Sequence, residues 1–210
     1  MSDETFGKAM AVHKDIAEAL GKPVVVGLTG GEPTLHPHLM DYIDFIIKYP
    51  QWFYPMVTTN GTNAEVCWKI LDLAKAGKIN AVLSRDNFHR EQGPIDPQLE
   101  AEWRAEHDRR NFSREYAELL GVYTGAMIFY EKSVIINEGR ARENVIKTVN
   151  GCRDPHPFIT ATGEIYSCGC FIESFGTVDY PSIPDNLLDI FDIMGLRYCA
   201  RRDTHPVRRF

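Results

Sequence analysis

Cysteines are the residues of this sequence with the clearest capacity for chemistry. Of the five cysteines, only Cys67 precedes residue 150. The others are Cys152, Cys168, Cys170 and Cys199. In a reducing compartment, an odd number of cysteines crowded into one segment favours metal binding over disulfides. The pattern therefore predicts a metal site in the C-terminal part of the chain.

A second candidate site is the run TGGEPTLHP at residues 29–37. It directly follows a short β-branched segment, and ligands of parallel α/β sheets bind outside the carboxyl ends of the strands. Gly30 and Gly31 let the backbone approach a ligand closely, and Pro33 stiffens the loop. Glu32 offers a carboxylate to a cationic group. Neither a Walker loop nor a dinucleotide fingerprint is present, so phosphate is not the expected ligand. The spacing alone is equally compatible with a tight turn whose glutamate is solvated.

Helix-like and strand-like patterns alternate up to residue 130. Apolar residues recur at helical spacing in residues 2–20, 64–76 and 97–120, and again after residue 38. Short apolar runs typical of strands occupy residues 24–28, 53–58, 81–84 and 126–130. Alternating strands and helices predict βαβ units in a parallel sheet, so the expected fold class is α/β. The first run, with three consecutive valines, predicts a strand that is covered on both faces.

Single residues refine these elements. Ser2 can cap the first helix and Gly21 can end it. Trp103 is expected on the core face of the helix over 97–120, and residues 100–110 are expected on a solvated, ion-paired surface.

The composition excludes several classes of function. The chain has 210 residues, 44% of them hydrophobic, and a formal net charge of −6. This charge provides no electrostatic footprint for nucleic acid. No apolar run approaches the roughly 20 residues that span a bilayer, and no signal-peptide pattern opens the chain. We therefore expect a cytoplasmic protein with no nucleic-acid or membrane partner.

Four motifs in order resemble those of the radical S-adenosylmethionine (radical SAM) enzymes. The first is LTGGEPTLHP at residues 28–37, which resembles the GGEP loop of that family. The others are VTTNGT at 57–62, VLSRDNFH at 82–89 and EGRA at 138–141, which are similar to its T-N-G-T, S-x-D-x-F-H and G-R-A motifs. The resemblance covers about residues 22–142 and implies an incomplete (β/α)6 barrel.

The resemblance also implies a binding site for S-adenosylmethionine (SAM). Gly30, Gly31 and Glu32, stiffened by Pro33, would hold the amino group of its methionine moiety. Two pairs of polar residues complete the expected site: Thr59 with Asn60, and Ser84 with Asp86, the latter near the ribose. Structural alternatives are an Asn-Gly turn for the first pair and a strand-end cap and turn for the second.

The defining motif of the family is absent. The radical SAM cluster is held by C-x3-C-x2-C after the first strand, and no such motif occurs in this sequence. Cys67 is most simply a small buried apolar residue. The helix over 2–20 corresponds to the one that follows the cluster loop, so the expected barrel lacks its first strand. The chain can be a fragment or a start assigned at an internal methionine, half of a split enzyme, or a paralogue that has lost the cluster.

The C-terminal cysteines carry a second resemblance. Cys152, Gly163 and Cys168 form C-x10-G-x4-C, which resembles the opening of the SPASM and twitch extensions that bind auxiliary iron–sulfur clusters. Gly163 would allow a hairpin turn between strands at 159–161 and 165–167. The later C-x2-C-x5-C-x3-C of the family is not found. The predicted ligand set of four cysteines suits one [4Fe-4S] cluster or a zinc ion, and the alternative is a hairpin with free thiols.

The expected organisation is a partial radical SAM barrel over 1–149 and a cysteine-rich extension over 150–210. A complete enzyme of this type would cleave SAM reductively to a 5′-deoxyadenosyl radical, whereas this chain alone is expected to be inactive. A partner could supply the missing cluster segment. The substrate stays open, with a peptide preferred. The alternatives are a cluster-less module that binds SAM or substrate, and a structural zinc protein.

Overall fold

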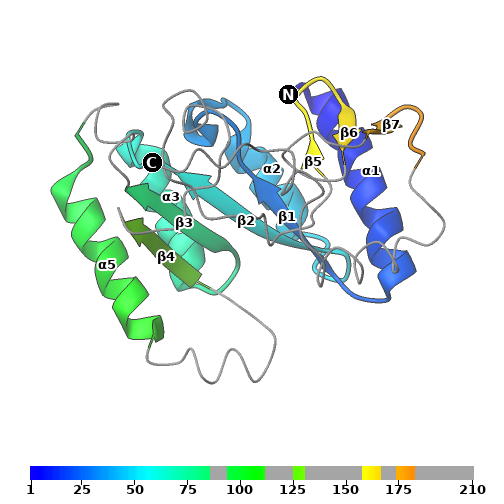
Figure 1. Cartoon of the computed structure of the whole chain (residues 1–210). Coiled ribbons are helices and arrows are strands. Elements are labelled where there is room, and N and C mark those ends of the chain that lie inside the picture. The colour runs from blue at the N-terminus through cyan, green and yellow to red at the C-terminus, as the bar shows by residue number, and fades with distance from the viewer. Residues whose placement is uncertain (86–93, 112–124, 131–157, 167–173, 183–210) are drawn as a thin grey trace, which may run out of the picture. The chain divides into compact units, whose positions relative to one another are not determined.

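The computed structural model of the chain describes residues 1–85, 94–111, 125–130, 158–166 and 174–182 (Figure 1). The chain divides into two compact units, of which one is Lys22–Ser133 and the other combines Met1–Gly21 with Val134–Phe210. The predicted boundary between 149 and 150 lies outside the described residues and stays a prediction. The N-terminal helix is grouped with the C-terminal strands.

The larger unit is built on a parallel sheet. Its strands, in spatial order, are β1 (Val24–Leu28), β2 (Phe53–Thr59), β3 (Asn80–Arg85) and β4 (Gly125–Tyr130). The connecting helices are the short 3-10 helix η1 (Pro33–Leu35), α2 (Leu39–Ile47), α3 (Ala64–Lys75) and α5 (Pro97–Asn111). All three strand pairs are parallel, so the predicted α/β class is confirmed.

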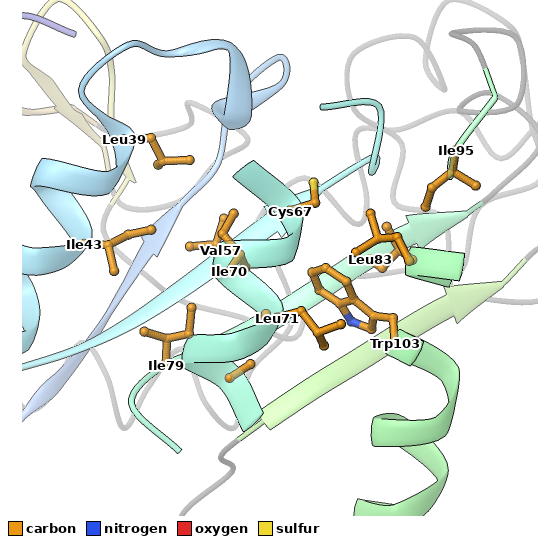
Figure 2. Packing of buried hydrophobic residues seen from close by; sticks show 13 residues of the cluster. Leu39, Ile43, Val57, Cys67, Ile70, Leu71, Ile79, Leu83, Ile95 and Trp103 are labelled. Atoms are coloured by element: carbon orange, nitrogen blue, oxygen red, sulfur yellow. The ribbon is translucent and has the colours of Figure 1, made fainter. Parts of the chain in front are cut away.

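The hydrophobic core of this unit lies between the sheet and its helices (Figure 2). Val57 of β2 and Leu83 of β3 face side chains of α2, α3 and α5 that are almost completely inaccessible. Trp103 of α5 is fully buried, as its position in the helical pattern predicted. At about 25 cal/mol per Å² of buried apolar surface, such side chains dominate the stability of the unit.

Two predictions about burial are wrong in detail. Val25 is 49% exposed, so β1 is not covered on both faces. Successive residues of a strand point to opposite faces, and Val25 and Gly27 are exposed whereas Val26 between them is buried, so one face of β1 is open. The expected ion-paired surface at residues 100–110 is confirmed at Glu100 and Glu102, which pair with Arg104 and Lys75. It is wrong at Glu106, which is only 4% exposed. Glu106 lies one turn beyond Trp103 on α5, and Arg109 compensates its burial with a two-bond ion pair at 2.7 and 2.9 Å.

The smaller unit contains α1 (Asp3–Leu20) and a three-stranded antiparallel sheet. Ser2 accepts a hydrogen bond from the Thr5 N–H, and Gly21 ends the helix with φ 64°, which confirms both predicted caps. The strands are β5 (Phe158–Ile159), β6 (Glu164–Tyr166) and β7 (Ser174–Thr177). β5 and β6 form the predicted hairpin with Gly163 at φ 93°, although both strands begin one residue earlier than expected.

Candidate functional site

The candidate site is formed by the loops that leave β1 and β2. Leu28 pairs with Val57, so the two neighbouring strands end at the same edge of the sheet. The run at residues 29–37 and the turn at residues 60–62 therefore meet, although about 30 residues separate them in the sequence. This carboxyl edge is where ligands bind in open α/β sheets.

Glu32 connects the two loops. Its Oε1 accepts hydrogen bonds from the Thr34 N–H at 3.1 Å, from the Thr34 hydroxyl at 2.6 Å and from the Thr59 hydroxyl at 2.7 Å. Its Oε2 accepts the N–H of Asn60 at 2.7 Å. The Thr34 N–H bond makes Glu32 the N-cap of η1, and Pro33 begins that helix. The carboxylate thus holds its own loop and the end of β2 in one arrangement.

Gly30 and Gly31 are exposed, whereas Glu32 beside them is half-buried and Thr34 is buried. Gly30 adopts φ 148°, a conformation that favours glycine, and no other heavy atom lies within 4 Å of the position of an added Cβ at either residue. A ligand can therefore approach this backbone from solvent.

Thr59 and Asn60 are brought to the site as predicted, but their side chains are 1% and 5% exposed. The Asn60 Oδ1 accepts hydrogen bonds from the Thr62 N–H at 2.9 Å and from the Thr62 hydroxyl at 2.8 Å. Gly61 follows with φ 83°, which is the Asn-Gly turn considered as the structural alternative. These two buried side chains hold the loops in place through hydrogen bonds to Glu32 and Thr62.

The N-terminus of α3 supports both loops. Asn63 caps the helix by accepting the Val66 N–H at 3.4 Å, and its Nδ2 donates to the Thr34 carbonyl at 2.7 Å. Thr34 belongs to the predicted run but was assigned no role, and Asn63 was not predicted as part of the site. The only sequence signal was an asparagine directly before a helical pattern, which indicates a cap and not the residue that it contacts.

The remaining predicted residues are placed only in part. Ser84 is half-buried near the end of β3. Asp86 and the four cysteines Cys152, Cys168, Cys170 and Cys199 lie outside the described residues. Among the residues that the structure describes, no group of three or more His, Cys, Asp or Glu side chains could hold a metal ion. Cys67 is fully buried, as predicted.

Comparisons with models of protein families, with curated proteins and with solved structures found no match to this chain. Within the described segments, no helix has the length and apolarity needed to cross a membrane.

Proposed function

We propose that the chain is a radical SAM family protein whose loop at residues 29–37 binds the methionine end of SAM. The observation that carries the proposal is the set of hydrogen bonds that joins Glu32 to the ends of both neighbouring strands. These bonds bring the two motifs of the resemblance together at the carboxyl edge of a parallel sheet. The finer architecture that we propose is a partial (β/α)6 barrel.

The hydrogen bonds of Glu32 indicate which groups of the loop can still contact a ligand. Oε1 already accepts three hydrogen bonds and has little capacity left, whereas Oε2 accepts the Asn60 N–H and can accept a further donor. We therefore assign the contacts with the ammonium, which only donates hydrogen bonds, to Oε2 of Glu32 and to the exposed backbone carbonyl oxygens of Gly30 and Gly31. Glu32 contributes its negative charge at short range and holds the loop in place.

SAM bound beside a reduced [4Fe-4S] cluster supplies a 5′-deoxyadenosyl radical in enzymes of this family. The motif that holds this cluster is not in this sequence, so we propose that the chain binds SAM and that radical chemistry needs a cluster-binding segment from a longer form of the chain or from a partner. We further propose that Cys152, Cys168, Cys170 and Cys199 bind an auxiliary iron–sulfur cluster, with zinc as the alternative. This assignment fits a cytoplasmic protein, where thiols stay reduced.

Titration calorimetry with three ligands tests the proposal on the full chain. SAM and S-adenosylhomocysteine both carry the ammonium, whereas 5′-methylthioadenosine lacks the amino-acid end. Because a charged hydrogen bond contributes about 1.5–3 kcal/mol, we expect 5′-methylthioadenosine to bind about 10- to 150-fold more weakly. Equal affinities for all three would refute recognition of the methionine end. No binding of SAM at millimolar concentration would overturn the proposal as a whole.

A further inference from the structure

Cys67 is a buried thiol in direct contact with the candidate site. It lies on α3 within the core cluster and is fully inaccessible to solvent (Figure 2). Its Sγ is 3.5 Å from the Oγ1 of Thr59. Burial raises the pKa of the thiol to about 11, so the sulfur carries its proton at neutral pH and can donate it.

The hydrogen bonds of Thr59 determine the direction of this contact. A threonine hydroxyl has one hydrogen and two lone pairs. The hydrogen is donated to Glu32 Oε1 at 2.7 Å, and one lone pair accepts the Gly61 N–H at 3.1 Å. The remaining lone pair is therefore the one that receives the S–H of Cys67. The hydrogen bonds run in one direction, from Cys67 through Thr59 to Glu32.

The same face of α3 contacts the site at a second point. Asn63 and Cys67 are four residues apart and lie one above the other on the helix. Asn63 donates to the Thr34 carbonyl, and Cys67 donates to Thr59, so each residue supports one of the two loops. Through these two contacts, α3 helps to fix the position of the Glu32 carboxylate.

We propose that Cys67 is a positioning residue of the site: its thiol orients the Thr59 hydroxyl, which in turn orients Glu32 and the glycine loop. The role in ligand binding rests on the proposed function, whereas the orientation of Glu32 does not. Cys67 itself contacts no ligand in this arrangement. It acts only through Thr59.

Amide hydrogen exchange of the full chain tests the orientation without any ligand. The Asn60 N–H is bonded to Glu32, so its exchange reports whether the carboxylate is held. We expect Cys67→Ala and Cys67→Val to accelerate this exchange about 2- to 10-fold, the range of one modest hydrogen bond. Ile70→Val is the matched control, because Ile70 is equally buried on α3. It should lower the melting temperature and leave the Asn60 exchange unchanged relative to other amides of the sheet.

A double-mutant cycle decides whether Cys67 acts through Thr59. In a Thr59→Val background the hydroxyl is gone, so adding Cys67→Ala should have no further effect on Asn60 exchange. Thr59→Ser restores the hydroxyl and should restore the effect of Cys67→Ala. The same acceleration in both backgrounds would overturn the proposal, as would wild-type exchange in Cys67→Val, which fills the site without a donor.

SAM affinity provides an independent readout. If the wild type binds SAM, Cys67→Ala should weaken binding about 2- to 10-fold, and Ile70→Val should not. If the wild type binds no SAM, the proposed function fails, and the exchange experiment still decides the role of Cys67. Unchanged SAM affinity with accelerated exchange would refute the part of the proposal that concerns ligand binding.

Discussion

The Glu32 carboxylate accepts hydrogen bonds from main-chain and side-chain donors of two loops. A carboxylate that accepts several hydrogen bonds is difficult to replace, because every donor that it leaves behind is partly removed from water. The sequence correctly placed Glu32 in a loop that directly follows a strand. It did not indicate these partners, because Thr59 and Asn60 come close to Glu32 only when β1 and β2 pair.

We expect Glu32→Gln to lower the free energy of unfolding by about 1–3 kcal/mol, because an amide NH2 would face at least one of the donors that now bind the carboxylate. Urea denaturation measures this change. Glu65→Gln is the matched control, since Glu65 is an exposed residue paired with Lys69 on α3, and it should change stability by less than about 0.5 kcal/mol. Equal stability of the wild type and Glu32→Gln would show that these hydrogen bonds contribute nothing.

The Cys67 thiol predicts a loss of stability at alkaline pH. Burial raises its pKa from 9.0 to about 11, so the folded state holds the proton more tightly than the unfolded state. The stabilisation is complete below about pH 9 and is lost as the pH rises to about 11, with a total of about 2–3 kcal/mol. Urea denaturation between pH 8 and 11 should show a steeper decline for the wild type than for Cys67→Ala. Parallel curves would contradict a buried, protonated thiol.

At the level of elements, the Asn-Gly turn after β2 leaves almost no room for a side chain at Gly61. Gly61 has φ 83°, and an added Cβ would lie 2.5 Å from Ile95 Cδ1 and 2.8 Å from Leu83 Cδ1. The turn chemistry was readable from the sequence, since Asn-Gly favours a positive φ. The contact with Ile95 was not readable, because no local pattern relates this residue to the turn.

We expect Gly61→Ala to destabilise the chain by about 2–5 kcal/mol, from backbone strain together with overpacking against Ile95 and Leu83. Gly77→Ala separates the two causes, because Gly77 has φ 71° and open space around it. That variant should lose only the strain of about 1–2 kcal/mol. Thermal and urea denaturation of both variants provide the comparison. Similar losses would mean that the contact with Ile95 is unimportant.

Helix ends and hairpins were the most predictable elements. Ser2, Gly21 and Gly163 act through local backbone geometry, which depends on residue type and a few neighbours. The exposure of Val25 could not be predicted in this way. An apolar run has the same appearance whether one face or both faces of the strand are covered, and only the tertiary packing distinguishes the two.

For the whole molecule, the alternation of strands and helices was sufficient to predict a parallel α/β sheet. The division into units was less accessible, since α1 precedes the sheet in sequence but is grouped with the antiparallel strands. Sequence order suggests that consecutive elements belong to one unit, but the grouping depends on contacts between residues far apart in the sequence. The cysteine site remains a prediction from spacing.

Anaerobic reconstitution tests the cysteine site in the full chain. We expect about four irons and four sulfides per chain with a broad visible absorption band, because four thiolates suit one [4Fe-4S] cluster. Cys168→Ala should abolish both. Cys67→Ala is the matched control and should retain the metal, since Cys67 is buried in the core of the sheet unit. One zinc without a visible band would favour the zinc alternative, and the absence of both metals would leave free thiols.

The turn at Asn60 also has a consequence for the chemical ageing of the protein. Asparagine followed by glycine is prone to deamidation, and asparagine is accordingly a thermolabile residue. The deprotonated glycine nitrogen attacks the side-chain carbonyl carbon and expels ammonia to form a succinimide, which water opens to aspartate or isoaspartate. Here the Gly61 N–H is donated to Thr59 and the Asn60 Oδ1 accepts two hydrogen bonds from Thr62, so neither reacting group is free to rotate into position. The folded turn therefore protects a dipeptide that would degrade in a flexible loop. The rate at which aspartate and isoaspartate accumulate at position 60 during storage would therefore measure how often this edge of the sheet opens.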